Sequence, residues 1–224
     1  MRTSLCLAFF ALAALLFAPT TARAQEATRL PDASRRSVGL EAGLEHAFIA
    51  RAVYTQRVAL GGLRDARIQA RFTLPVVTPD LGDVSLDGSL RATLLAWGDV
   101  RLALLAGPVL KVSSNRVFTG ASFGVGATLL VGYEGPRWGL SAEAGYEQTL
   151  TTYIRHSDLY RQVSHADARD GWYAFSGSTA RVGLRAGVRL GSVEISARGG
   201  IDATGQFHSI LPPYYATLGG ACAF

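Results

Sequence analysis

The sequence contains one lysine, one methionine and two cysteines among its 224 residues, so arginine carries almost all of its positive charge. Charged residues make up only 17% of the chain and hydrophobic residues 49%, a composition that excludes an intrinsically disordered protein. The 22 Lys and Arg residues exceed the 17 Asp and Glu residues by five. Because the arginines are dispersed and form no basic tract, the composition argues against a nucleic-acid-binding surface.

The N-terminal segment has the organisation of a secretory signal peptide. Arg2 provides a positive start, residues 5–19 form an almost continuous apolar run, and the small residues Ala22 and Ala24 follow. The apolar run is short for a membrane-spanning helix, which needs about 20 residues. The sequence therefore predicts a signal peptide at residues 1–24, cleaved after Ala24.

Long hydrophobic runs are absent after this segment. If the mature chain spans a membrane, it must therefore do so with strands and not with helices. Cleavage would also remove Cys6 and leave Cys222 alone, so the mature chain would have no internal disulfide. We expect Cys222 to be either a small apolar wall residue or a free thiol with a partner.

From residue 37 onward, apolar and polar residues alternate with the period of two that is typical of strands with two different faces. In the segment 181–190, Arg181, Arg185 and Arg189 occupy one face, while valines and leucines occupy the other. A helix would also align these arginines, but the two intervening glycines would each cost it about 1 kcal/mol relative to alanine. The pattern predicts about ten strands, at residues 38–48, 51–60, 66–76, 84–97, 99–111, 121–133, 137–154, 175–190, 192–202 and 214–224.

The predicted connections alternate in length, and the chain ends in the aromatic residue Phe224. These features resemble the bacterial outer-membrane β-barrel superfamily. The resemblance implies an all-β, closed, antiparallel up-and-down transmembrane β-barrel of about 10 strands (8–12) in the cell outer membrane, with the lipid bilayer and the barrel-assembly machinery, which would read Phe224, as partners. The expected organisation is a signal peptide at 1–24, a periplasmic lead-in at 25–36 and a barrel domain at 37–224. Short turns are expected at Gly61–Asp65, Gly98–Asp99, Glu134–Pro136 and Gly191–Ser192, and longer links at Thr78–Asp83, Ser113–Gly120, Arg155–Ala174 and Asp202–Pro213.

The cost of placing charge in lipid predicts which face of each strand points inward. One arginine that faces lipid near the bilayer midplane costs roughly 2–4 kcal/mol, so three on one strand would cost about 6–12 kcal/mol. That penalty is comparable to the stability of a whole domain, about 5–15 kcal/mol. The expected lumen-lining residues are Glu41, Arg67, Arg71, Arg91, Arg101, Glu143, Glu147, Arg181, Arg185 and Arg189.

Aromatic residues are expected to form two belts, one at each end of the strands. Trp97, Tyr133 and Trp138 adjoin predicted short turns, whereas Trp172 and Phe175 adjoin the longest predicted loop. Such belts are typical of barrels at the two membrane–water interfaces. The alternative fold is a soluble exported β-sandwich, in which the apolar set would be internal and the charged set would face water.

The sequence favours a non-enzymatic barrel whose lumen is either filled by arginine–carboxylate pairs or forms a narrow, anion-biased channel. A second hypothesis is a surface-binding barrel that uses the loop at 155–174. A third is an outer-membrane barrel enzyme with loop His and Asp residues, but no catalytic or metal-binding motif accompanies them. We therefore expect no catalytic residue, no metal and no cofactor. The four histidines, all in predicted outer loops, are His46, His156, His165 and His208.

Overall fold

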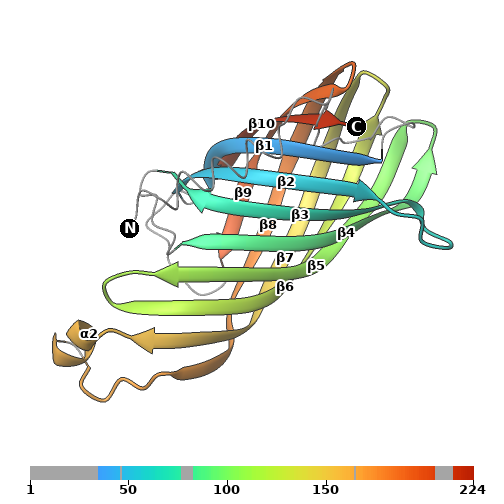
Figure 1. Cartoon of the computed structure of the whole chain (residues 1–224). Helices are drawn as coiled ribbons and strands as arrows, with labels where there is room; N and C mark the ends of the chain where they lie inside the picture. Colours follow the sequence, from blue (N-terminus) through green and yellow to red (C-terminus); the bar gives the residue numbers. More distant parts are fainter. Residues whose placement is uncertain (1–34, 46, 77–82, 164, 205–213) are drawn as a thin grey trace.

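The computed structural model describes residues 35–224, except 46, 77–82, 164 and 205–213. The described chain is almost entirely strand, with one short helix between the two longest strands (Figure 1). In chain order the elements are β1 (Arg36–Glu45), β2 (Ala47–Arg57), β3 (Arg64–Pro75), β4 (Val84–Trp97), β5 (Val100–Ser114), β6 (Phe118–Glu134), β7 (Trp138–His156), α2 (Asp158–Val163), β8 (Gly171–Leu190), β9 (Val193–Thr204) and β10 (Tyr214–Ala223).

The ten strands form one closed barrel in which each strand pairs antiparallel with its neighbours in the chain, and β1 pairs with β10 (Figure 1). The closing register runs from Ser37 opposite Ala223 to Glu45 opposite Tyr215. The predicted closed, antiparallel, up-and-down barrel of ten strands is confirmed, and the β-sandwich alternative is wrong. Closure matters physically because it pairs the strand edges that an open sheet would leave exposed.

Tight turns join the strands at the end of the barrel that also holds Arg36 and Phe224. Gly98 and Gly191 adopt positive φ values of 61° and 67° in the β4–β5 and β8–β9 turns. Glycine adopts this conformation without the steric penalty that other residues incur, which makes very short hairpins possible. We call this end of the barrel the turn end and the opposite end the loop end.

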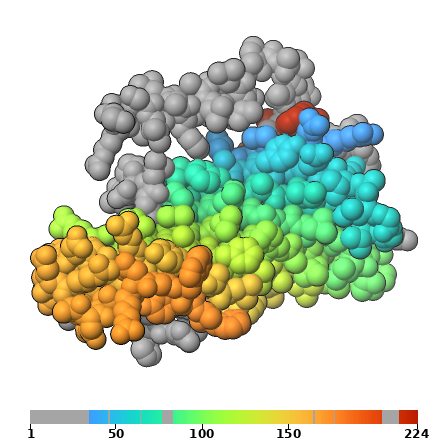
Figure 2. Space-filling model, turned by 60° about the horizontal axis from the view of Figure 1, so that its bottom comes forward, coloured from blue at the N-terminus to red at the C-terminus, as the bar shows by residue number. Residues whose placement is uncertain are grey.

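The barrel is taller on one side than on the other. Strands β4 to β8 contain 14 to 20 residues, whereas the remaining strands contain 10 to 12. The longest pair, β7 and β8, carries α2 at its tip. We call residues 153–175 the β7–β8 hairpin tip. It projects beyond the neighbouring strands at the loop end and is orange in Figures 1 and 2.

One predicted long link does not exist. Strand β5 continues to Ser114 and β6 begins at Phe118, so the expected long link at Ser113–Gly120 is wrong. The Asn115 side-chain oxygen accepts hydrogen bonds from the backbone N–H of Val117 (2.8 Å) and of Phe118 (2.9 Å). An asparagine that bonds to the backbone just ahead of it closes a short turn, and its polar neighbours imitate the composition of a longer loop.

Two further details of the strand ends differ from expectation. The predicted loop at 155–174 contains the end of β7, the helix α2 and the beginning of β8, so it is partly strand. The strand predicted at 99–111 continues to Ser114, six residues beyond Pro108. Pro108 is exposed on the barrel exterior, where the pairing of β4 and β5 omits it from the register.

The two faces of the sheet differ sharply in polarity. On β8, the side chains of Val182 and Leu184 point outward and are 65% and 59% exposed. Arg185, the residue after Leu184, points inward and is only 8% exposed. The same alternation runs along β1, β2, β6, β7 and β10. The apolar side chains therefore cover the outer wall, and the charged side chains are enclosed. Buried apolar residues that join the charged ones inside include Val53, Ala66, Ala103, Leu130 and Tyr215.

Replacing Gly107 by alanine is expected to lower the free energy of unfolding by roughly 1–3 kcal/mol. A Cβ atom there would lie 2.1 Å from the backbone oxygen of Gly88 on the adjacent strand. Gly126, the register partner of Gly107 on β6, is the matched control, because its Cβ would be 3.6 Å from the nearest atom. Urea unfolding followed by tryptophan fluorescence measures the free energy of unfolding of the Gly107→Ala and Gly126→Ala variants. An equal loss of stability in the two variants would contradict the close packing of β5 against β4 at Gly107.

Candidate functional site

The charged interior of the barrel is the candidate site. The structure places all ten expected lumen residues on the enclosed face of the wall. Side chains that are nearly inaccessible to solvent are Glu41, Arg67, Arg91, Glu143 and Arg185, and those that retain partial exposure are Arg71, Arg101, Glu147, Arg181 and Arg189.

Glu45 on β1 is the meeting point of three guanidinium groups. Its carboxylate lies 2.7 Å from Arg51 on β2 and 3.7 Å from both Arg181 on β8 and Arg198 on β9. Strand β10 separates β1 from β9, and two strands separate β1 from β8, so these contacts cross the barrel interior. Arg51 also binds Glu41 at 2.9 Å. The network therefore ties non-neighbouring strands together through the lumen.

A second carboxylate, Glu143 on β7, anchors the opposite side of this network. Arg198 donates to Glu143 at 2.7 Å, and the hydroxyl of Tyr215 on β10 donates to the same carboxylate. The guanidinium carbons of Arg181 and Arg198 lie over the Tyr215 ring, 4.6 Å and 5.2 Å from its centroid. Arg181 is in turn held by Asp202, with two hydrogen bonds of 2.6 Å and 2.8 Å. Ring faces and paired carboxylates replace the water that these cations would otherwise need.

A separate group of ion pairs fills the turn end. Glu134 at the end of β6 binds Arg91 on β4 and lies 3.8 Å from Arg101 on β5. Asp65 at the start of β3 binds Arg67. The side chains of Arg67, Arg91 and Glu134 are at most 7% exposed, so they occupy the lumen and exclude solvent.

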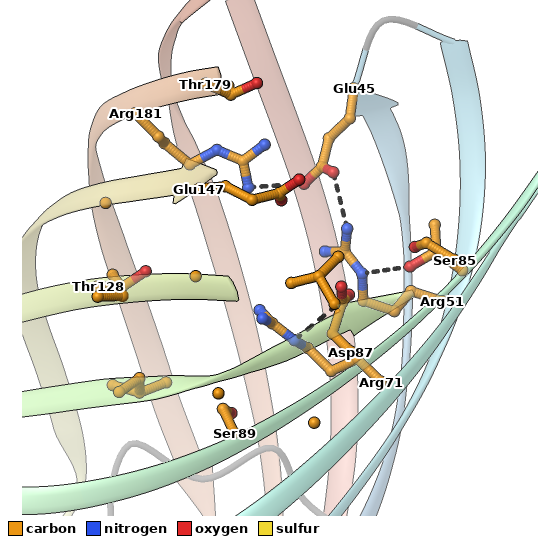
Figure 3. A pocket seen from close by; sticks show the side chains of 18 of the residues that line it. Glu45, Arg51, Arg71, Ser85, Asp87, Ser89, Thr128, Glu147, Thr179 and Arg181 are labelled. Atoms are coloured by element: carbon orange, nitrogen blue, oxygen red, sulfur yellow. Dashed lines mark hydrogen bonds and ion pairs between the residues drawn. The ribbon is translucent and has the colours of Figure 1, made fainter. Parts of the chain in front are cut away.

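The loop-end half of the interior is hollow instead. A cavity of about 240 Å³ lies there, with walls from β1 through β9 (Figure 3). We call it the loop-end cup. Its charged lining residues are Arg51, Arg71, Lys111, Arg181 and Arg198, against Glu45, Asp87 and Glu147.

Sequence alternation alone missed several of these interior residues. Arg51 lies in a segment with alanine, isoleucine and valine on its inner side, so polarity did not distinguish the two faces of β2. Tyr215 is 2% exposed and points inward, because the outward position belongs to Tyr214 beside it. Lys111 was unassigned, although it is the only lysine in the chain. Leu110 and Leu218 point outward, so strict alternation along β5 and β10 would have predicted that Lys111 and Tyr215 point inward.

The remaining predicted features lie away from the interior. Phe224 is 47% exposed, and its backbone closes the seam with Arg36 through hydrogen bonds of 3.0 Å and 3.1 Å. Cys222 is half-buried on β10, opposite Val38 on β1 and Val193 on β9.

The hairpin tip holds the two described histidines. The Nδ1 atom of His156 lies 3.3 Å from Asp170, and its ring stacks on Tyr160, which also contacts His165. The backbone N–H of His156 and the guanidinium of Arg161 bind Asp170 and lower its pKa to about 2. Asp170 therefore links the end of β7 to α2. His46 and His208 lie outside the described residues, and within the described ranges no three His, Cys, Asp or Glu side chains are grouped as a metal site would require.

Comparison of the chain with protein-family models and with curated proteins finds no match in either. Among the helices that the structure describes, none combines the length and apolarity needed to cross a membrane.

Replacing Glu143 by glutamine is expected to lower the free energy of unfolding by about 3–5 kcal/mol, because it leaves Arg198 buried beside an uncharged group. The control is Asp158→Asn on α2, where the Asp158 side chain is 92% exposed and lies 3.9 Å from Arg161. An exposed pair of this kind contributes about 0–1 kcal/mol. Urea unfolding compares the two variants, and a Glu143→Gln loss no larger than that of Asp158→Asn would refute the structural role of the interior network.

Proposed function

We propose that this chain is an integral outer-membrane β-barrel whose lumen is sealed at the turn end. The observation that carries the proposal is the outer wall, which is apolar on strand after strand. Large apolar residues that are more than 45% exposed there include Leu40, Ile68, Leu86, Leu94, Val131, Leu140, Val182, Leu184, Val188, Ile195, Ile201 and Leu218.

This wall has no protein partner within the described chain, because the interior is already occupied by the charged network. Soluble monomers rarely expose contiguous apolar patches larger than a few hundred Å². A ring of leucine, valine and isoleucine around a closed barrel is the surface that a hydrocarbon environment stabilises. The lipid bilayer is therefore the partner that best explains an inverted distribution of polarity.

The aromatic residues support the same placement. At the turn end, Tyr133 packs against Trp138 with ring centroids 4.4 Å apart, and Trp97 is 65% exposed. Toward the loop end, Tyr153 packs against Trp172 at 5.3 Å. Two such groups on either side of an apolar band match the interfacial belts of membrane barrels.

The turn-end ion pairs favour a structural barrel over a conducting channel. A channel needs a continuous water-filled path, whereas Arg67, Arg91 and Glu134 are packed against one another beyond the reach of solvent. Barrels of about eight strands have interiors just wide enough to be filled by side chains, and ten strands leave somewhat more room. The sealed lumen thus excludes bulk ion flow under this proposal.

A surface-binding role is the second candidate, favoured by the hairpin tip. Trp172 and Phe175 are 70% and 66% exposed, and Leu159 and Val163 on α2 are 57% and 75% exposed. Aromatic and aliphatic residues that project from a barrel end are typical of protein-binding surfaces. We further propose export by the 1–24 signal peptide, with Phe224 recognised by the assembly machinery.

Membrane placement predicts a difference between two equally exposed leucines. Leu184→Arg on the mid-wall of β8 is expected to lower the free energy of unfolding in lipid vesicles by roughly 2–4 kcal/mol. Leu159→Arg on α2, outside the apolar band, is the control and is expected to change it by no more than about 0.5 kcal/mol. The two side chains are 59% and 57% exposed. Equal, small effects of both changes would contradict insertion of β8 into lipid.

The sealed lumen predicts that the purified barrel produces no discrete current steps in planar bilayers. The positive control combines Arg67→Ala, Arg91→Ala and Glu134→Ala, which removes three deeply buried turn-end side chains and is expected to open a conducting path. Current steps from the unaltered barrel that are as large as those from the triple-alanine control would favour the narrow-channel function instead.

A further inference from the structure

The first part of β8 pairs with one neighbouring strand only. Strand β7 pairs with β8 from Gly171 to Val188, whereas β9 pairs with β8 only from Thr179 onward. Within the described chain, residues 171–178 therefore have β7 on one side and no strand on the other. In Figure 1 this segment lies in the hairpin that projects beyond the neighbouring strands at the loop end.

A β-bulge at Phe175 divides this segment. The register of β7 and β8 shifts there, because two residues of β8 stand opposite one of β7, and Phe175 has a φ of 50°. A bulky residue rarely adopts a positive φ, and a bulge bends its strand. The side-chain amide of Gln148 stabilises the bulge, because it donates to the backbone oxygens of Thr149 at 3.0 Å and of Gly177 at 2.9 Å. Residues 171–174, which we call the tip edge, lie beyond this bulge.

The connection between β9 and β10 is too short to cover the tip edge. It runs through residues 205–213 to Tyr214, which pairs with Ile201 on β9. A strand that continued β9 as far as the tip edge would have to extend to residue 208, about 23 Å past the level of Ile201. The return from residue 208 to Tyr214 spans at most about 22 Å when fully extended, before any turn is made. Strand β9 therefore cannot extend far enough to pair with the tip edge.

The hydrogen bonds of β7 show which of its backbone groups face β8. In an antiparallel pair, successive residues direct their N–H and C=O groups alternately toward and away from a given neighbour. The N–H of His156 donates to Asp170 on the β8 side, whereas the N–H of the next residue, Ser157, donates to Val117 on the β6 side. Two residues before His156, the backbone of Ile154 therefore faces β8.

The register extends this assignment to the tip edge. Ile154 pairs with Gly171, so the backbone groups of Gly171 and Tyr173 face β7. The N–H and C=O groups of Trp172 and Ala174 then point to the other side, where no strand of the described chain pairs with them. Two donors and two acceptors in a row are the groups to which an added strand binds.

The side chains of the tip edge are exposed and uncharged. Trp172 is 70% exposed, and its ring packs against Tyr153 with centroids 5.3 Å apart. Tyr173 is 43% exposed on the opposite face, and its hydroxyl donates to the backbone oxygen of Arg169 at 3.0 Å. Residues 171–180 include no charged residue, although natural proteins commonly protect edge strands with charge or proline. This edge therefore fits an uncharged extended segment that has apolar residues at alternate positions.

We propose that the tip edge binds an extended, uncharged peptide segment of another protein, which adds to β8 as a further strand. Main-chain hydrogen bonds to Trp172 and Ala174 supply affinity, and contacts with the rings of Trp172 and Tyr173 select apolar side chains. The hydrogen bonds of Asp170 hold the tip in place before binding, which lowers the cost of ordering it. This inference rests on the surface-binding role proposed for the hairpin tip and is independent of membrane placement.

The test is a nuclear magnetic resonance titration of the refolded mature chain in nanodiscs with the peptide acetyl-Thr-Val-Thr-Phe-Thr-Val-Thr-amide. We expect saturable binding, with nuclear Overhauser effects between peptide backbone protons and the amide protons of Trp172 and Ala174. Peptides that are N-methylated at successive positions provide the control. Because only every second peptide N–H faces β8, methylation is expected to weaken binding roughly tenfold at alternate positions and no more than about twofold at the others.

Three variants of the barrel locate the contact. Trp172→Ala is expected to weaken peptide binding roughly fivefold, because it removes an aromatic contact. Ala174→Pro is expected to weaken it about tenfold or more, because it removes an N–H that faces the open side and none that faces β7. Leu159→Ala is the control, since Leu159 is 57% exposed on the same hairpin tip but outside the edge, and it is expected to change binding by no more than about twofold. Nuclear Overhauser effects between Thr152 and Tyr173 verify that β7 and β8 remain paired in each variant.

The proposal is overturned if the folded barrel shows no saturable binding, or if Leu159→Ala weakens binding as much as Trp172→Ala. Binding that N-methylation weakens equally at every position would leave a surface-binding tip but overturn strand addition. Association of the barrels through the tip edge without peptide, measured by analytical ultracentrifugation, would also overturn the proposal, because a second copy would then occupy the edge. None of these outcomes bears on membrane placement, which Leu184→Arg tests separately.

Discussion

Pairing of buried charge is the constraint on which this barrel depends. Many charged side chains share one face of the strands, and each can leave water only if an opposite charge or a hydrogen-bond partner takes the place of its hydration. A closed barrel meets that demand because it brings distant strands together, as in the contacts of Glu45 with Arg181 and Arg198. Enclosing the charged face leaves the leucines and valines outside. The outer wall is thus apolar because the charged side chains find their partners inside the barrel.

The two ends of the interior differ in how completely side chains fill them. Side chains of Arg67, Arg91 and Glu134 fill the turn end, whereas glycines on β5, β6 and β7 keep the loop end open. The packed and the hollow parts of the interior are therefore separated along the axis of the barrel. The long β7–β8 hairpin adds a third, exposed region at the same end as the cup.

The fold was largely predictable, because period-two alternation needs only the local sequence. The number of strands and the grouping of the arginines on one face follow from it, whereas closure was implied by the resemblance to outer-membrane barrels. The continuation of β5 from residue 111 to Ser114 was not predicted, since the polar residues around Asn115 resemble a longer loop in composition. The inward position of Tyr215 and the pairing of Arg51 with Glu41 depend on register and on contacts between strands, neither of which leaves a local mark.

Contact between lipid and the outer wall is the central claim, and it can be measured directly by nuclear Overhauser effects in nanodiscs with methyl-labelled protein. The account predicts cross-peaks from lipid acyl-chain protons to the methyl groups of Leu184 and Val188, and none to the enclosed Val53. Cross-peaks from water to Leu184 and Val188, with none from acyl chains, would contradict it.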